Sequence, residues 1–585
     1  MDMEQPVLAE KPSNGLAGLK HWRHDLVAGL LVSLISLPFS LGIAVASGAP
    51  PIAGLISAII AGLVLPFLGG SYVTISGPAA GLAPALLVAM VALGRGDLAT
   101  GYPLLLGVIC LTGCVQLVLS RLKAARFSAF FPSVVVEGML ASIGLMIIAK
   151  QLPHLAGHEF RSHEFFGILN EAPAQFARVE PNVFLVGLAC TVLIFWLGSL
   201  KARWLKIVPP QVIIVGLGIV LGRLLHLDGH YLIHIPNEPF KHGIVLPNFR
   251  GLLTDHALWL TIATTVLTLT LIDGVESLAT IAAIDRIDPF RRKSNPDRTL
   301  FAMGVSNICS SMAGGLTIIP GGVKSTACIQ GGGRTQWANF YNACFLLTYL
   351  FAAKGLINLI PFGALAAILI FTGYKLCKPT VWRHTAHVGS EQLLLFAFTV
   401  LVTLSTDLLW GIAAGSVAKL LMNAFFAVRL AHTTPLGGPG SHRMGRVLDL
   451  FRNPITERSL SGDTYHLYVG RPMVCFNTLH LHSELVSIPP GAAVVKLHLT
   501  DSVSLIDHTA YENLMHFVGE FERGGLARFE VIGLDRMRMR SEHPACIRLA
   551  YPVLALAAAG GPWSSPGIDS VPTKDEGIPA RADID

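Results

Sequence analysis

The sequence predicts a polytopic α-helical membrane protein with a small α/β domain at its C-terminal end. Of its 585 residues, 52% are hydrophobic and only 14% are charged, whereas soluble proteins carry about 25% charged residues. Apolar segments of about the length that crosses a bilayer recur between residues 25 and 430. After residue 430 the composition becomes that of an ordinary soluble domain. These observations place most of the chain in a membrane.

Fourteen transmembrane elements are expected, twelve of them full spans and two of them half-helices. The half-helices, at 77–93 and 322–330, are short and interrupted by glycine. Because each half of the chain then holds seven elements, an odd number, the second half enters the membrane in the opposite direction, which is an inverted repeat. The spans are expected at 25–47, 51–68, 101–120, 127–151, 183–199, 207–226, 256–284, 299–315, 335–355, 356–374, 391–406 and 408–428.

The basic residues predict the orientation, because Lys and Arg concentrate in short cytoplasmic loops. With the N-terminus inside, every strongly basic loop lies on the inner side. We therefore expect a multi-pass protein of the inner (cytoplasmic) membrane with both termini cytoplasmic and no signal peptide. This pattern also accounts for the net charge of +6, so no nucleic-acid partner is expected. The basic inner loops contain Arg121, Lys123 and Arg126; Lys201, Arg203 and Lys206; Arg286, Arg291, Arg292, Lys293 and Arg298; and Lys375, Lys378 and Arg383.

Five regions follow from these changes in composition. They are a cytoplasmic segment (1–24), the transmembrane region (25–430), a Gly/Pro-rich linker (431–459), an α/β domain (460–558) and a tail expected to be disordered (559–585). Within the α/β domain, β-like runs at 464–470, 493–500 and 528–533 surround an amphipathic helix that begins near Thr509.

An acidic stripe crosses the apolar segment 265–293. Asp273, Glu276, Ser277 and Thr280 are three or four residues apart, so a helix places them on one face. A carboxylate at that depth costs roughly 2.5–3.5 kcal/mol on insertion scales. The stripe therefore indicates a pathway for an ion, a proton or a substrate.

Matching motifs precede the two half-helices, Ser76-Gly77-Pro78 in the first half and Pro320-Gly321-Gly322 in the second. Paired interrupted segments of this kind point to a transporter binding site. Helix N-termini present unpaired N–H groups and a positive dipole end, which suits an anion. Lys324 adds a formal positive charge beside the second N-terminus.

Three explanations of the carboxylates remain open from the residues alone. Two carboxylates one turn apart disfavour simultaneous ionisation, which suits proton coupling. Sodium could instead hold both ionised, with hydroxyl oxygens of Ser277 or Thr280 as further ligands. The third explanation is an internal ion pair between Glu276 and Lys324 that only makes their burial tolerable.

Several long motifs in this order resemble the SulP family of anion permeases and exchangers. They are LVAGLLVSLISLPFSLGIAVASGAPPIAGL, GGSYVTISGPAAGLAP, VESLATIAAID, GGLTIIPGGVKSTACIQGGGRT and STDLLWGIAAGS. The resemblance implies core and gate domains, an elevator mechanism, a homodimer and a cytoplasmic STAS domain, for which residues 460 to about 555 are the candidate.

The resemblance also implies roles for individual residues. Glu276 matches the acidic coupling residue of the eighth helix, and Thr280 matches a neighbouring cation ligand, so both would bind sodium if sodium is the coupling ion. The resemblance does not carry over Asp273, which stays a candidate for cation coupling from its place in the acidic stripe, with a tuning or packing role favoured. The backbone N–H groups expected to hold the anion are those of Ser76, Gly77 and Ala79 in the first half and Gly321, Gly322 and Val323 in the second, beside the Lys324 side chain.

Three positions depart from the family pattern. Lys324 stands where arginine is usual, and lysine cannot make the bidentate fork of arginine. Phe39 stands where many members have a glutamine that could contact substrate. His508-Thr509 stands where regulatory relatives have a Ser-Ser or Ser-Thr pair before glycine, which argues against phosphorylation and leaves Thr509 as the one candidate acceptor, so a scaffolding or dimer-contact role of the domain is favoured.

The sequence thus predicts secondary active transport of a small inorganic oxyanion, sulfate or bicarbonate, by sodium or proton symport. An uncoupled exchanger or channel is the first alternative, and a membrane-anchored sensor acting through the STAS-like domain is the second. No enzyme is expected, since no nucleophile–base pair, phosphate loop or zinc spacing is present, and no cofactor beyond a coupling sodium ion. The histidines of two predicted outer loops are too irregularly spaced to indicate a metal site.

Overall fold

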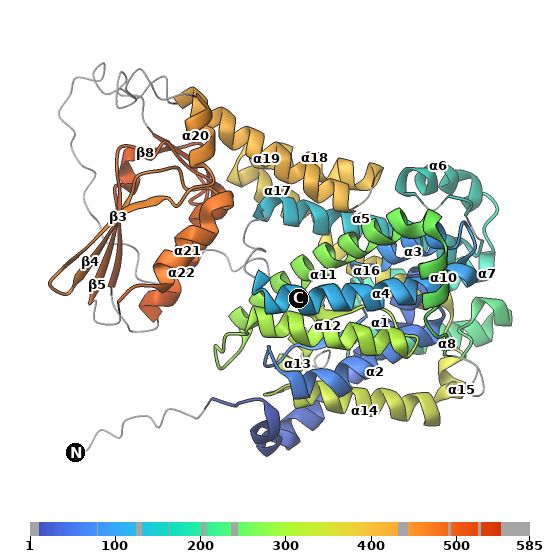
Figure 1. Ribbon diagram of the computed structural model, residues 1–585. Helices are drawn as coiled ribbons and strands as arrows, with labels where there is room; N and C mark the ends of the chain where they lie inside the picture. Colours follow the sequence, from blue (N-terminus) through green and yellow to red (C-terminus); the bar gives the residue numbers. More distant parts are fainter. Residues whose placement is uncertain are drawn as a thin grey trace. The chain divides into compact units, whose positions relative to one another are not determined.

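The structure is a computed structural model whose elements are drawn in Figure 1. It describes residues 11–78, 80–124, 132–158, 160–162, 164–200, 205, 208–235, 244–406, 408–430, 443–489, 493–523 and 528–550. The chain divides into two compact units. The first comprises Met1–Arg126, Leu140–Cys377 and Leu404–Leu409, and the second comprises Phe127–Met139, Lys378–Thr403 and Trp410–Asp585.

Helices dominate residues 22–430. In the first half they are α1 (Trp22–Ala46), α2 (Pro51–Leu68), α3 (Ala83–Leu93), α4 (Leu98–Arg121), α5 (Ser133–Ala156), α6 (Phe165–Phe176), α7 (Pro181–Ser199) and α8 (Pro210–Leu224). In the second half they are α10 (Phe249–Thr254), α11 (Trp259–Ile287), α12 (Pro296–Met312), α13 (Gly322–Gln330), α14 (Trp337–Ala352), α15 (Lys354–Ile357), α16 (Phe362–Leu376), α17 (Pro379–Val388), α18 (Ser390–Ser405) and α19 (Leu408–Leu430).

The helices agree with the predicted membrane-protein class. Within the described ranges, eight helices are long and apolar enough to cross a membrane, and α3, α8 and α18 are shorter apolar helices. Most predicted spans begin and end within a few residues of an observed helix. The count of fourteen elements remains a prediction.

Several helix boundaries differ from the predicted ones. The span expected at 127–151 corresponds to α5, which continues to Ala156, and its first residues, 127–131, lie outside the described residues. The span expected from residue 356 is α16, which begins at Phe362, directly after Pro361; the residue before a proline is disfavoured in a helix. The half-helix expected from residue 77 begins only at Ala83. Residues Ile75–Pro78 form strand β1 instead, whose backbone groups bond to a second strand rather than to a helical turn.

Close helix contacts in the first unit rest on glycine. A β-carbon built on Gly113 of α4 would lie 2.7 Å from the carbonyl oxygen of Gly304 in α12, and one built on Gly304 would lie 2.8 Å from that of Gly113. Since small residues let membrane helices approach backbone to backbone, this pair holds α4 against α12. That contact matters for the site, because both helices contribute a buried amide to it.

The C-terminal strands form a four-stranded sheet in the order β3-β4-β5-β7. Strands β3 (Ile455–Ser461) and β4 (Thr464–Val469) are antiparallel, whereas β4, β5 (Val494–Leu499) and β7 (Arg528–Ile532) are parallel. Parallel neighbours need a crossover, and α21 (Thr478–Val486) and α22 (His508–Arg523) lie in those two connections. A three-stranded sheet holds β6 (Leu505–Ile506), β9 (Arg548–Ala550) and β8 (Met537–Met539).

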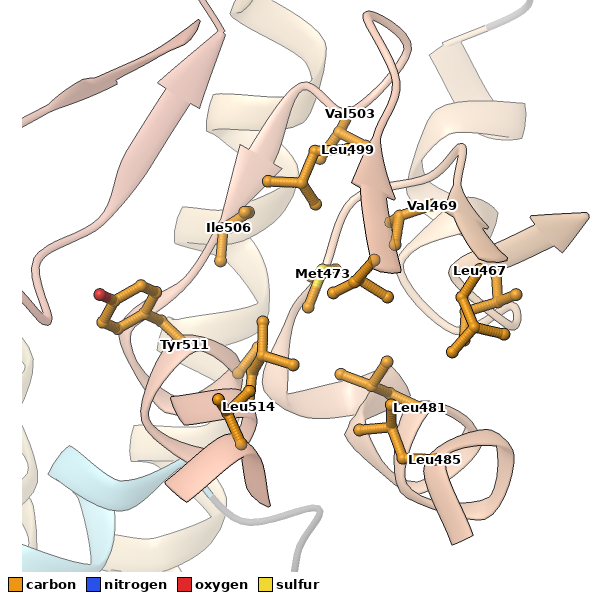
Figure 2. Packing of buried hydrophobic residues seen from close by; sticks show 14 of the residues in the cluster. Leu467, Val469, Met473, Leu481, Leu485, Leu499, Val503, Ile506, Tyr511 and Leu514 are labelled. Carbon is orange, nitrogen blue, oxygen red and sulfur yellow. The ribbon is translucent and has the colours of Figure 1, made fainter. Parts of the chain in front are cut away.

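One face of the four-stranded sheet carries an apolar core. Along β4 and β5, alternate side chains are buried, as expected for strands with one covered face. Figure 2 shows Leu467 and Val469 of β4 packed with Leu481 and Leu485 of α21 and with Leu514 of α22. The predicted strands and helix therefore exist, and the sheet already begins at Ile455, upstream of the predicted domain start at residue 460. The domain boundaries and the STAS assignment remain predictions, and the predicted tail, 559–585, lies outside the described residues.

Helix α19 is joined to the start of α22 by a buried polar cluster. Oδ2 of Asp507 accepts hydrogen bonds from Asn423 Nδ2 (3.0 Å) and from the backbone N–H of Cys475 (3.1 Å). The Lys419 ammonium lies 3.7 Å from the same oxygen, and both side chains are fully buried. Next to this cluster, the backbone N–H of Ser133 donates to Thr509 Oγ1 at 3.1 Å. Because Thr509 is only 4% exposed, its hydroxyl is closed to a kinase in this arrangement.

Candidate functional site

The two glycine motifs lie in two short strands that pair with each other. Strand β1 pairs antiparallel with β2 (Ile318–Gly321), and Ser76 lies opposite Pro320 while Gly77 lies opposite Ile319. Helix α13 begins at Gly322, directly after β2, and α3 begins five residues after β1. The starts of both half-helices therefore lie beside the β1–β2 strand pair. Ala79, which the sequence analysis also assigns to the anion site, lies outside the described residues.

Lys324 faces the first glycine motif. A β-carbon built on Gly77 would lie 2.5 Å from Lys324 Nζ, and one built on Gly321 would lie 3.2 Å from its Cε. The Lys324 side chain is only 3% exposed. Within the described ranges, Nζ has no hydrogen-bond partner, and no carboxylate lies within salt-bridge distance of it. A buried charge without a partner is strongly unfavourable, and an anion bound beside Nζ would compensate the charge of the ammonium group.

Glu276 faces the next glycine along the same segment. A β-carbon built on Gly81 would lie 2.7 Å from Oε1 of Glu276 and closer still to Oε2. Oε2 is buried and has no hydrogen-bond partner among the described residues. The two opposite charges, Glu276 and Lys324, form no salt bridge with each other in this part of the chain. The internal ion pair considered above as an alternative is absent from this arrangement.

Asp273 differs from Glu276 because donors surround its carboxylate. Oδ2 accepts hydrogen bonds from Gln116 Nε2 and from Asn307 Nδ2 (3.0 Å), and Ser277 Oγ donates to Oδ1 at 3.4 Å. The Asn307 amide also donates to Gln116 Oε1 at 2.9 Å. Its own oxygen accepts the backbone N–H of Ile318 at 2.6 Å. Asp273 thus ties α11 to α4, to α12 and to the first residue of β2.

The remaining predicted site residues lie around the β1–β2 strand pair. Thr280 is half-buried and adjoins the start of α13, since a β-carbon built on Gly322 would lie 4.0 Å from its Cγ2. Ser76 is 2% exposed, and Val323 follows Gly322 in the first turn of α13. The structure therefore brings Thr280 and Glu276 of α11 to the two glycine motifs.

Phe39 of α1, which stands where the resemblance predicts a glutamine in many members, packs inside the protein. Its aromatic ring is buried, with 5% exposure, so it offers no polar contact. The neighbouring hydroxyl of Ser40 is fully buried, and its Oγ lacks a hydrogen-bond partner within the described ranges.

Four residues at this site were not identified by the sequence analysis: Gln116, Asn307, Gly81 and Ser325. Ser325 accepts the backbone N–H of Ile75 at 2.9 Å and donates to the Gly321 carbonyl at 2.7 Å, which joins β1 to the end of β2. Side-chain amides inside apolar segments are unusual and often link helices, so Gln116 and Asn307 carried a usable signal. Gly81 carried none, because one glycine among many does not reveal its neighbour.

No metal-ion cluster accompanies the site. Across the described ranges, no group of three or more His, Cys, Asp or Glu side chains is arranged to hold a metal ion. A single coupling cation at Glu276 would instead take oxygen ligands from one carboxylate, hydroxyls and backbone carbonyls.

Comparison with known proteins places this geometry in a family. Residues 22–399 match the model of the sulfate permease family. The bicarbonate transporter BicA of Picosynechococcus sp. is 25% identical over 404 residues, which cover 67% of this chain and 68% of that protein. A probable sulfate transporter of Mycobacterium tuberculosis is 24% identical over 422 residues, which cover 72% of this chain and 73% of that protein.

A solved structure agrees with this result. The transmembrane domain of a cyanobacterial bicarbonate transporter BicA superimposes with a TM-score of 0.59 and 24% sequence identity, covering 68% of this chain and 97% of that domain. The fold is thus that of a polytopic helical membrane transporter, and the family resemblance read from the sequence motifs is confirmed. The chain belongs to the sulfate permease family of anion transporters.

Proposed function

We propose that the chain is a secondary active transporter that carries a small inorganic oxyanion, sulfate or bicarbonate, together with sodium or a proton. One observation carries the proposal: two buried charges of opposite sign, Lys324 and Glu276, face the same glycine segment without pairing with each other. Each charge needs a counter-ion before its burial becomes favourable. In this proposal the Lys324 ammonium binds the anion and the Glu276 carboxylate binds the cation, so both ions occupy one site.

The anion in this proposal lies between the starts of α3 and α13. Backbone N–H groups of Gly321, Gly322 and Val323, and of Ser76, Gly77 and Ala79 in the first half, would donate to its oxygens beside the Lys324 ammonium. Helix N-termini favour negative charge, and glycine lets an oxyanion approach the backbone closely. The names of the relatives, a bicarbonate transporter and a probable sulfate transporter, support the class of anion.

The cation binds at Glu276 with Thr280 as neighbour. While Glu276 is ionised and empty, its charge repels an incoming anion, and this repulsion is strong in a medium of low dielectric constant. Sodium or a proton removes that charge, so binding of the cation favours binding of the anion. Asp273 acts as a positioning residue in this scheme, because its hydrogen bonds through Asn307 reach the N–H of Ile318 in β2.

The wider transport cycle follows the family resemblance. We place the protein in the inner membrane with both termini cytoplasmic, where the loaded core domain slides against the gate domain in an elevator motion, and where two copies form a dimer. The C-terminal sheet domain, of STAS type in this proposal, serves as a scaffold or dimer contact.

The direct test is uptake by reconstituted protein. We expect the full chain in liposomes to accumulate labelled sulfate or bicarbonate when an inward sodium or proton gradient is imposed, and to lose this accumulation when the gradient is collapsed. Uptake that does not depend on either gradient would argue against symport and for uncoupled exchange or conductance. Absence of uptake of both anions under every gradient would refute the proposed function.

A deletion separates transport from a sensor role. Removal of residues 440–585 is expected to leave measurable gradient-driven uptake, because the site residues all lie upstream of residue 326. Complete loss of activity in a deletion variant that remains folded would favour a protein that works through its C-terminal domain.

A further inference from the structure

A second buried lysine contacts the half-helix of the candidate site. Lys150 of α5 is 7% exposed, and its ammonium donates to the backbone carbonyl of Pro84 at 3.3 Å. Pro84 lies in the first turn of α3, only a few residues beyond Gly81. Lys150 and Lys324 therefore contact the same short segment, one at each end of residues 77–84.

The partner of Lys150 does not compensate its charge. The Pro84 carbonyl is neutral, and 3.3 Å is longer than the usual range for this kind of hydrogen bond. A carbonyl inside a helix is, in addition, the acceptor for the helix's own bonding pattern. No carboxylate of the described residues lies within salt-bridge distance of Lys150. The ammonium is thus buried with one weak, shared acceptor.

Two structural explanations of Lys150 fit the geometry poorly. A lysine that snorkels would carry its ammonium group to the polar membrane interface, which 7% exposure contradicts. A lysine that only fastens α5 to α3 would need no charge, since an uncharged donor can bond to a carbonyl. Charged residues inside a membrane protein are expensive and mark ion or substrate pathways by default.

A neighbouring amide also lacks an acceptor. Gln151 follows Lys150 and is 1% exposed, and its Nε2 has no hydrogen-bond partner within the described ranges. Consecutive residues of a helix point about 100° apart, so Gln151 is a separate buried donor and does not share the contact that Lys150 makes with Pro84. An oxyanion supplies several strong acceptors at once.

The position of Lys150 along α5 bears on its depth in the membrane. It lies seventeen residues after Ser133, the first residue of α5, or roughly 25 Å along the helix at 1.5 Å per residue. With the predicted orientation, α5 begins on the cytoplasmic side. Lys150 then lies in the outer half of the membrane, where an anion from outside would reach it before Lys324.

We propose that Lys150 forms an outer binding station for the transported oxyanion against the first turn of α3. This inference rests on the proposed function and adds to it a residue that defines affinity for external anion. The station holds the anion by one charge-assisted hydrogen bond from Nζ and passes it to Lys324 and the half-helix N-termini.

Concentration-dependent uptake in liposomes tests the station, with anion supplied from the outside face. Lys150→Met is expected to raise the external KM for sulfate or bicarbonate about tenfold, as loss of one charge-assisted hydrogen bond predicts, while the maximal rate falls less than about threefold. Lys150→Arg should restore the KM to within about threefold. The matched control is Arg223→Met at the exposed end of α8, which removes the same charge and should leave the KM unchanged.

The outcomes separate this inference from the proposed function. A folded Lys150→Met protein with the wild-type external KM would overturn the station and leave the transporter intact. If Lys150→Met elutes as an aggregate, Lys150→Gln, which keeps a donor for Pro84 but no charge, takes its place, and a wild-type KM there has the same meaning. An equal rise of the KM for anion supplied at the inner face would contradict the outer location. Wild-type protein without any anion uptake would instead refute the proposed function itself.

Discussion

Gly81 and the carboxylate of Glu276 occupy adjacent space, so that a β-carbon at residue 81 would lie 2.7 Å from Oε1. Real β-carbons essentially never approach another heavy atom to less than 3.0 Å. The carboxylate can hold its position only because residue 81 has no side chain. This contact links the glycine segment after β1 to the acidic stripe of α11. The cation site can therefore be tested by substitutions at Gly81 and at Glu276.

Gly81→Ala should displace the Glu276 carboxylate and reduce cation-driven uptake at least about tenfold, the effect of losing roughly 1.4 kcal/mol of binding. Liposome uptake with and without an imposed gradient measures this. Gly216→Ala in α8 is the matched control, because a β-carbon there has no atom within 4 Å. A Gly81→Ala protein with wild-type cation dependence would show that the carboxylate has room to move without losing its function.

Glu276→Gln should abolish cation-driven uptake while the protein stays folded. The amide keeps the size of the side chain but removes the charge that binds sodium or a proton. Size-exclusion profiles and thermal unfolding verify folding, and gradient-driven uptake measures the loss. Full gradient-driven transport in this variant would remove Glu276 from the mechanism.

Asp273→Leu should destabilise the protein, because it removes the carboxylate oxygen that accepts from the buried amides of Gln116 and Asn307. Each buried donor left without an acceptor costs about 1–3 kcal/mol, so the free energy of unfolding should fall by about 2 kcal/mol or more. Thermal unfolding in detergent compares this variant with Ser277→Ala, which removes only the longer 3.4 Å contact and should cost less. Equal stability of Asp273→Leu and wild type would disprove the anchoring role.

Lys324→Ala should weaken anion binding more than cation binding. The expected change is a rise of about tenfold or more in the anion KM, as removal of a charged hydrogen-bond donor predicts, with the concentration of cation for half-maximal uptake altered less than about threefold. Uptake measured at varied anion and varied cation gives both constants. Equal effects on the two constants would argue against an anion role for Lys324.

Acidification should loosen segment 541–546 from α17. Burial and the neighbouring His384 ring, 5.2 Å away between centroids, lower the pKa of His543, and His508 and His387 add to this effect while Glu512 opposes it. Above pH 6.5, the ordinary histidine pKa, His543 is neutral whether docked or free. Below it, a released segment takes up a proton that the docked one resists, so docking weakens as pH falls.

Hydrogen exchange of residues 540–548, corrected for intrinsic rates, between pH 7.5 and 5.5 measures this docking. The docked state includes the hydrogen bond from Ser541 Oγ to the Val388 carbonyl at 2.7 Å and the pair of Arg540 with Glu391 at 3.9 Å. His543→Gln should flatten the pH dependence, whereas His226→Gln at an exposed position should not. An unchanged pH profile in His543→Gln would assign the effect to another group.

Much of the molecule could be predicted from the sequence because the signals are local. The length of the apolar segments predicts the spans. The Gly and Pro residues before the half-helices predict the two motifs, which β1 and β2 bring together with Gly77 opposite Ile319. The strands of the C-terminal sheet follow from alternating burial along β4 and β5. Boundaries were less predictable, since Pro361 and the pairing of β1 with β2 set where α16 and α3 begin.

The amino-acid sequence by itself determined the class of protein, the approximate spans and the family, because these depend on composition and on motifs read along the chain. Only the tertiary structure decided which buried charges have partners. Asp273 and Glu276 lie one turn apart on α11, yet the first meets the amides of Gln116 and Asn307 while the second meets the bare backbone of Gly81. Such neighbours come from α4, α12 and the segment before α3, and no pattern along α11 can specify them.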